Sequence, residues 1–173
     1  MQVSASLMCA NPLNIERDVR ELDAAGIDFW HMDIMDGVYV PNLALNFDTI
    51  KAVRQISRVP IDTHLMVQSP ADYLEMCADA GVDYLSFHIE QVPFPHRLIQ
   101  RIKDLGMKVG VAINPATDLD FLPYIIDKLD YVLVMTVEPG FAGQRFIGNT
   151  LPKIAAIRAL AEERGLDLPI QVD

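Results

Sequence analysis

The chain has 173 residues, of which 51% are hydrophobic and 22% are charged, a composition that fits one globular domain and excludes a disordered or fibrous chain. Its formal net charge of -10 disfavours nucleic acid and anionic membranes as partners, because its electrostatic field repels both. Cys9 and Cys77 stand alone without CxxC spacing, so neither a disulfide framework nor a thiolate zinc site is indicated.

No apolar stretch approaches the roughly 20 residues that a helix needs to span a bilayer. The first residues, MQVSASLMCA, lack the basic region that opens a signal peptide. We therefore expect a cytoplasmic protein without a membrane-spanning segment.

Short runs rich in valine, isoleucine and aromatic residues alternate with longer stretches of helical periodicity, which predicts repeated βα units. In chain order, we expect strands at 2–6, 29–34, 60–64, 84–88, 108–113, 131–135 and 169–173. Helices are expected between them at 12–25, 47–57, 70–80, 95–105, 119–127 and 151–164. Gly26 and Gly81 are expected just past two of these helices, while Pro12, Pro70 and Pro95 are expected in first turns.

Six βα units followed by a seventh strand predict an α/β fold of the TIM (β/α)8 barrel type, truncated after the seventh strand. We expect residues 1–173 to form a single barrel domain that lacks the final βα elements. An open doubly wound sheet is the competing architecture, but no GxGxxG motif follows any predicted strand.

Polar and titratable side chains recur at the C-terminal ends of the predicted strands, where a parallel barrel builds its active site. They are His31, Asp33, His64, His88, Glu90, Asn114 and Asp173. Residues two apart in a strand share a face, so His31 and Asp33 can point into the same mouth. The candidate metal ligands are His31, Asp33, His64 and Asp173. Their two imidazoles and two carboxylates suit one divalent ion of Zn, Fe(II), Mn or Co, and the identity of the metal stays open.

Other residues near these strand ends allow two interpretations each. His88 and Glu90 either orient the metal ligands or form a structural hydrogen-bonded pair. The methionines at the strand ends, namely Met8, Met35, Met66 and Met135, either line the pocket or fill the core. The glycines of segment 137–144 either let backbone N–H groups approach an anion, as a phosphate-handling lid, or simply form a turn.

Five motifs occur in order along the chain. They are Ser6-Leu7-Met8, His31-Met32-Asp33-Ile34-Met35-Asp36-Gly37, Val40-Pro41-Asn42, His64-Leu65-Met66 and Val134-Met135-Thr136-Val137-Glu138-Pro139-Gly140-Phe141, followed at the end by Val172-Asp173. With these motifs the sequence resembles the ribulose-phosphate 3-epimerase family over essentially its whole length. Two segments, Ser6-Leu7-Met8-Cys9 and Phe141-Ala142-Gly143-Gln144, look more like the allulose-6-phosphate branch than the ribulose-5-phosphate branch.

The resemblance implies an isomerase, a metal-dependent 3-epimerase that acts on a small phosphorylated ketose through an enediolate. The substrate pair is D-allulose 6-phosphate and D-fructose 6-phosphate, or D-ribulose 5-phosphate and D-xylulose 5-phosphate. Asp33 and Asp173 are implied as the acid/base carboxylates, with His31 and His64 completing the metal ligand set. Ser6 and His64 are implied to contact the substrate, and a covering segment is implied at Gly140, Phe141, Ala142 and Gly143. A homo-oligomer is left open.

Two alternatives remain at this point. One is a decarboxylase or aldolase on a related phosphate-binding barrel, which would want a lysine near a strand end, and the predicted strand ends carry none. The other is an inactive sugar-phosphate-binding fragment, because the phosphate-binding glycines and serine of the family follow the seventh and eighth strands and do not occur in this sequence.

Overall fold

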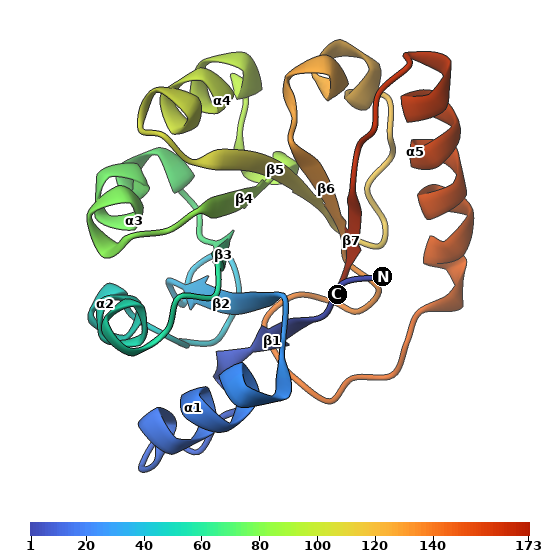
Figure 1. Ribbon diagram of the computed structural model, residues 1–173. Coiled ribbons are helices and arrows are strands. Elements are labelled where there is room, and N and C mark those ends of the chain that lie inside the picture. The colour runs from blue at the N-terminus through green and yellow to red at the C-terminus, as the bar shows by residue number, and fades with distance from the viewer.

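Seven parallel strands form one sheet in the computed structural model, which describes residues 1–173. The strands are β1 (Ser4–Ser6), β2 (Phe29–Met35), β3 (Ile61–Met66), β4 (Tyr84–His88), β5 (Lys108–Ile113), β6 (Tyr131–Val134) and β7 (Ile170–Val172). Each strand pairs with its neighbours in the chain, so the order in the sheet is β1 to β7 without a crossover. Figure 1 shows that the sheet curls, with its helices on the outside. The predicted TIM-type α/β fold is confirmed, with seven strands where a closed barrel has eight.

Five α-helices cover the outer face of the sheet. They are α1 (Ile15–Ala25), α2 (Phe47–Ile56), α3 (Leu74–Ala80), α4 (Pro95–Asp104) and α5 (Leu151–Glu163). The glycines predicted to end two of them do so: Gly26 and Gly81 adopt the left-handed conformation, with φ of 81° and 82°, directly after α1 and α3. Each such turn leads straight into the next strand.

The helix predicted at 119–127 is wrong. This segment forms two 3₁₀ turns, Leu122–Tyr124 and Ile126–Lys128. Pro123 has no backbone N–H and cannot lie inside an α-helix without breaking it, so the segment turns tightly instead. Leu122 and Ile126 are nevertheless completely buried, which explains why their spacing imitates a helix.

Two of the expected helix starts also shift. Helix α1 begins at Ile15 rather than at Pro12, because the Asn11 side chain accepts a hydrogen bond from the Leu13 N–H and holds a turn there. Pro70 opens a 3₁₀ turn, Pro70–Asp72, before α3. Pro95 is the first residue of α4, as predicted.

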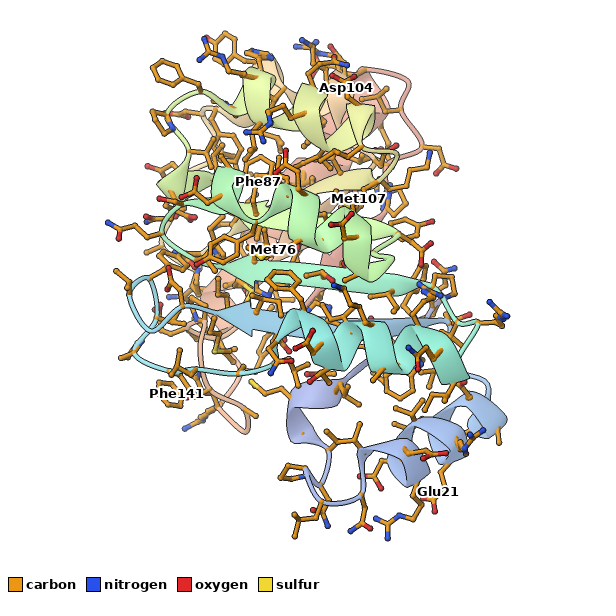
Figure 2. All side chains as sticks on the ribbon, turned by 90° about the vertical axis from the view of Figure 1, so that its left-hand side faces the viewer. Glu21, Met76, Phe87, Asp104, Met107 and Phe141 are labelled. Atoms are coloured by element: carbon orange, nitrogen blue, oxygen red, sulfur yellow. The ribbon has the colours of Figure 1, made fainter.

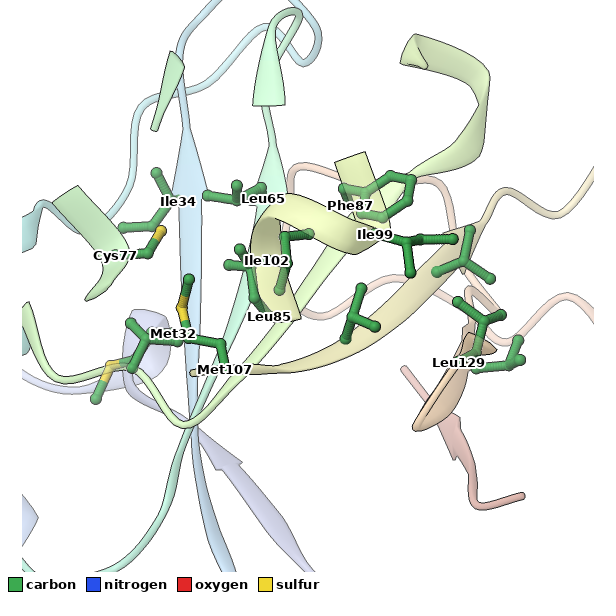
Figure 3. Packing of buried hydrophobic residues seen from close by; sticks show 14 of the residues in the cluster. Met32, Ile34, Leu65, Cys77, Leu85, Phe87, Ile99, Ile102, Met107 and Leu129 are labelled. Atoms are coloured by element: carbon green, nitrogen blue, oxygen red, sulfur yellow. The ribbon is translucent and has the colours of Figure 1, made fainter. Parts of the chain in front are cut away.

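The apolar core lies between the helices and the outer face of the sheet. Alternate strand residues contribute to it, and Figure 3 shows Ile99 and Ile102 of α4 beside Leu85 and Phe87 of β4. Successive strand residues point to opposite faces, so the residues between these core positions point to the inside of the curled sheet. That interior face carries the polar side chains considered below.

The strands all run in one direction, and their C-terminal ends meet at one end of the molecule. Figure 2 shows that Phe141, in the loop after β6, lies at the end toward which the arrow of β2 points. None of the helices is both long enough and apolar enough to span a membrane.

Candidate functional site

The four predicted ligands lie together at the C-terminal ends of three strands. Asp33 of β2 pairs with His64 of β3 in the sheet register, His31 lies two residues before Asp33, and Asp173 directly follows β7. One ligand atom from each residue lies within 4.8 Å of those of the other three. The Asp33 carboxylate is 3.3 Å from His31 Nε2 and 3.4 Å from His64 Nδ1, and Asp173 Oδ2 is 3.7 Å from His31 Nε2.

Two ring nitrogens at the centre of this cluster are buried and have no hydrogen-bond partner. They are His31 Nε2 and His64 Nδ1. A buried polar atom without a partner costs free energy, so such atoms need a reason. A divalent cation would satisfy both lone pairs, and the carboxylates of Asp33 and Asp173 would supply its oxygen ligands. The residues therefore fit a cation, and this mixed N/O set leaves several first-row metals open.

The other ring nitrogen of His31 meets a buried carboxylate that the sequence reasoning missed. Asp62, only 3% exposed, lies 2.7 Å from His31 Nδ1 through its Oδ2. Burial alone would raise the pKa of Asp62, but the His31 charge and hydrogen bonds from His31, Gln171 and Tyr131 outweigh it and lower the pKa. The sequence did contain a signal, because Asp62 is two residues before His64 and shares its face of the strand.

His64 is held in a similar way by the pair that the sequence left open. Its Nε2 lies 2.8 Å from His88 Nε2, and His88 Nδ1 lies 3.3 Å from the Glu90 carboxylate. Burial lowers the pKa of His88 to about 4, so the ring is neutral near pH 7. A neutral His88 that donates to Glu90 must accept from His64, which leaves the lone pair of His64 on Nδ1, facing the cluster. This geometry matches the orienting interpretation of His88 and Glu90.

Asp33 is the carboxylate at the centre of the cluster. Burial alone would raise the pKa of Asp33, but the adjacent rings of His31 and His64 outweigh it and hold this pKa well below its usual range. In turn, the Asp62 and Asp33 carboxylates raise the pKa of His31, against the effect of burial. The Ser6 hydroxyl donates to Asp33 Oδ2 over 2.7 Å and fixes the orientation of the carboxylate. Asp33 is therefore ionised, as a metal ligand or a proton acceptor requires.

A cavity of about 290 Å³ lies over the exposed side of this cluster. Its predicted wall residues are Ser6, Asp33, Met35, Met66, Met135, Gly140, Phe141, Ala142, Gly143 and Asp173, together with Met8. The sequence reasoning did not assign the other wall residues, which are Cys9, Val137, Glu138, Pro139 and Gln144, although four of them belong to the segment it singled out. His31 and His64 do not line the cavity, and His64 is completely buried behind its wall.

The cavity is covered where two loops meet. The Asn42 side-chain amide, in the loop after β2, donates to the Gly140 carbonyl over 2.7 Å. Gly140 has φ of 115°, and a Cβ there would lie 3.0 Å from Val40 Cβ, so both its conformation and the contact favour glycine. Gln144 donates to the Phe141 carbonyl over 2.9 Å and braces the loop from within. Loop 137–144 therefore covers the cavity and contacts the loop after β2.

The sequence matches known proteins along nearly its whole length. Residues 2–173 match the model of the Ribulose-phosphate 3 epimerase family. The ribulose-phosphate 3-epimerase of Bacillus subtilis is 41% identical over 174 residues, an alignment that covers 100% of this chain and 80% of that protein. Enzymes of the same name from Synechocystis and Escherichia coli are 42% and 40% identical, over 99% of this chain and 75% and 76% of their own lengths.

Solved structures that resemble this one are much more distant in sequence. A mutant tryptophan synthase alpha-subunit from Pyrococcus furiosus superposes with a TM-score of 0.67 at 15% identity, covering 99% of this chain and 77% of that one. Yersinia pestis DHPS superposes with a TM-score of 0.63 at 15% identity, covering 99% and 70%. At this level of identity the likeness shows a shared fold and nothing about the reaction.

Proposed function

The chain belongs to the ribulose-phosphate 3-epimerase family, whose named members are isomerases, and on that premise we propose that it inverts C3 of a small phosphorylated ketose with the help of a divalent cation. The observation on which this proposal rests is the cluster itself. Two ionisable carboxylates and two unpartnered imidazole nitrogens meet beside a cavity of about 290 Å³.

Inversion next to a ketone removes a proton from one face of C3 and returns one to the other face, so two acid/base groups must flank the carbon. We assign these roles to Asp33, on β2, and Asp173, after β7, which both line the cavity. Asp33 is buried and held by Ser6, whereas the Asp173 side chain is 40% exposed. A cation held by these two carboxylates with His31 and His64 would supply Lewis-acid stabilisation for the negative charge that develops on the substrate oxygens.

The cover formed by loop 137–144 has its own part in this proposal. Deprotonation next to a ketone gives a reactive enediolate, and excluding water from the site protects this intermediate from side reactions. Loop 137–144 forms much of the cavity wall, and Asn42 ties it to the loop after β2. We assign to this loop the exclusion of water from the bound sugar.

The size of the sugar is the finer part of the proposal. The names of the curated relatives favour a pentose substrate, D-ribulose 5-phosphate. The segments 6–9 and 141–144, which line the cavity, favour the hexose substrate D-allulose 6-phosphate. Parallel assays of both sugars on the metal-loaded protein decide between them, because the preferred sugar will have the higher kcat/KM.

The lysine-dependent alternative finds little support in the site. Lys153 of α5 comes close to the C-terminal end of β5, where its ammonium donates to the carbonyls of Asn114 and Pro115 over 2.7 and 3.0 Å. Lys153 does not line the cavity. A lysine-based aldolase or decarboxylase would need a free amine there.

The test of the proposal is the exchange of the substrate C3 hydrogen with D₂O, followed by proton NMR at saturating metal. We expect Asp33→Asn to reduce exchange of the epimer whose C3 proton faces Asp33 by about 10²- to 10⁴-fold, the usual contribution of a general acid or base. Asp173→Asn should stop epimerisation yet allow exchange with the one epimer whose C3 proton faces Asp33. Asp127→Asn, at an exposed surface carboxylate, is the matched control and should behave as wild type. Normal exchange of both epimers in Asp33→Asn would remove that residue from the mechanism.

A further inference from the structure

Asp62 is a buried carboxylate that does not reach the cavity yet receives three hydrogen bonds. Its Oδ2 accepts from His31 Nδ1 and from the Gln171 amide, both over 2.7 Å, and its Oδ1 accepts from the Tyr131 hydroxyl over 2.9 Å. These partners come from β2, β7 and β6, while Asp62 lies on β3. We propose that Asp62, anchored by Tyr131 and Gln171, is a positioning residue that sets the ring orientation and tautomer of His31 for the cation.

The Asp62 carboxylate determines which nitrogen of the His31 ring keeps its hydrogen. An ionised carboxylate can only accept, so the ring must donate its Nδ1–H to Asp62. When a cation replaces the other ring proton, the ring that keeps its hydrogen on Nδ1 has its lone pair on Nε2, the buried, unpartnered atom that faces Asp33 and Asp173. Carboxylate partners of this kind orient imidazole ligands and make them more basic toward metals.

The anchors of Asp62 make this arrangement rigid. The Tyr131 ring is 5% exposed and packs over Gly110, the neighbouring residue in the sheet register, where there is no side chain to obstruct it. From there its hydroxyl reaches Asp62 across the inside of the curled sheet. Gln171, on the neighbouring strand β7, also donates to Asp62 and lies 3.2 Å from His31 Nδ1. Asp62 therefore has no free rotation that would release His31.

This inference rests on the proposed cation site, so its test measures binding of the metal alone. Co²⁺ is titrated into the metal-free protein and followed by its visible absorption, which reports both affinity and coordination geometry. We expect Asp62→Asn to raise the Kd for Co²⁺ about 10- to 100-fold, the usual effect of removing a partner of a metal ligand. Asp127→Asn is the control that removes a carboxylate far from the site and should leave the Kd unchanged.

A second variant keeps the test decisive if Asp62→Asn does not fold. Tyr131→Phe removes one hydroxyl and keeps the ring over Gly110, so the fold is retained while Asp62 loses an anchor. We expect this change to raise the Kd for Co²⁺ about 2- to 10-fold and to alter the absorption spectrum. In the double variant Asp62→Asn/Tyr131→Phe the two losses should not add, because the hydroxyl acts only through Asp62.

The outcomes are distinct. If the wild-type protein binds no Co²⁺, the proposed function fails at its cation site. If the wild-type protein binds Co²⁺ and Asp62→Asn, folded by circular dichroism, binds it equally well, the cation site stands and the positioning role of Asp62 is refuted. If Asp62→Asn is unfolded, an unchanged Kd and spectrum in Tyr131→Phe refute the role instead.

Discussion

Gly110→Ala is a single added methyl group with a large expected effect. A Cβ at Gly110 would lie 2.4 Å from Tyr131 Cζ and 2.6 Å from Cε1 and Cε2, about 1 Å short of ordinary van der Waals contact. The Tyr131 ring is buried and its hydroxyl is bonded to Asp62, so the ring must shift from this position to admit the methyl group. Overpacking of this kind costs about 1–3 kcal/mol. A ring displaced by about 1 Å also weakens the 2.9 Å bond to Asp62, and hydrogen bonds to charged groups contribute about 1.5–3 kcal/mol.

Together these effects predict that Gly110→Ala lowers the free energy of unfolding by about 2–5 kcal/mol. For a chain of this length, 1 kcal/mol corresponds to about 2–4 °C, so a loss near 3 kcal/mol lowers Tm by about 6–12 °C. Thermal and urea denaturation measure both quantities. The matched control is Gly148→Ala, because a Cβ on Gly148 would meet no atom within 4 Å and its φ is not positive, and this variant should stay within about 0.5 kcal/mol of wild type.

The clash has a specific partner, which allows a stricter test. Tyr131→Ala removes the ring, so the added methyl of Gly110→Ala should cost much less in the double variant than alone. A Gly110→Ala protein that unfolds within about 1 °C of wild type would refute the packing argument, as would full additivity of the two changes.

Three further outcomes are expected. Asn42→Ala removes the 2.7 Å hydrogen bond to the Gly140 carbonyl, so KM should rise and chymotrypsin should cut loop 137–144 faster than in wild type. Equal digestion rates for the variant and wild type would contradict the bracing role of Asn42. Burial lowers the pKa of His88 to about 4, so the free energy of unfolding should fall by on the order of 3 kcal/mol as the pH falls from about 6.5 through 4. Urea denaturation with a chelator measures this loss, which His88→Gln should lack. An identical loss in His88→Gln would be contrary evidence. Burial raises the pKa of Cys77 to about 12, so iodoacetamide at pH 8 should label the exposed Cys9 alone in the native protein, as mass spectrometry can check.

The local pattern of the sequence was enough to place the strands. A strand in a parallel barrel needs only a short run of β-branched and aromatic residues between helical segments, and each predicted strand lies within two residues of the observed one. The same logic failed at 119–127, because apolar spacing reports burial rather than helix geometry. There Pro123 decided the backbone conformation.

The candidate site was predictable because of one geometrical rule. Parallel strands bring their C-terminal ends to one edge, so His31, His64 and Asp173 could be grouped although they are far apart in sequence. Asp62 escaped this rule because it is the second residue of β3, away from the C-terminal end of that strand, although it lies beside His31 in the sheet register. Its role depends on Tyr131, which reaches it from a strand three places away, and no local pattern reports such a contact.

The site also depends on the curl of the sheet. In a flat sheet β2 and β7 would lie five strand spacings, or about 24 Å, apart. Yet His31 Nε2 is 3.7 Å from Asp173 Oδ2, and His31 Nδ1 is 3.2 Å from Gln171. The Asp62 contacts hold these strands together across the interior, so the residues that maintain the curl are those that orient the ligand. A cation that binds only the curled form would stabilise it by RT ln(1 + [M]/Kd). Metal affinity and folding are therefore coupled through Asp62 and its partners.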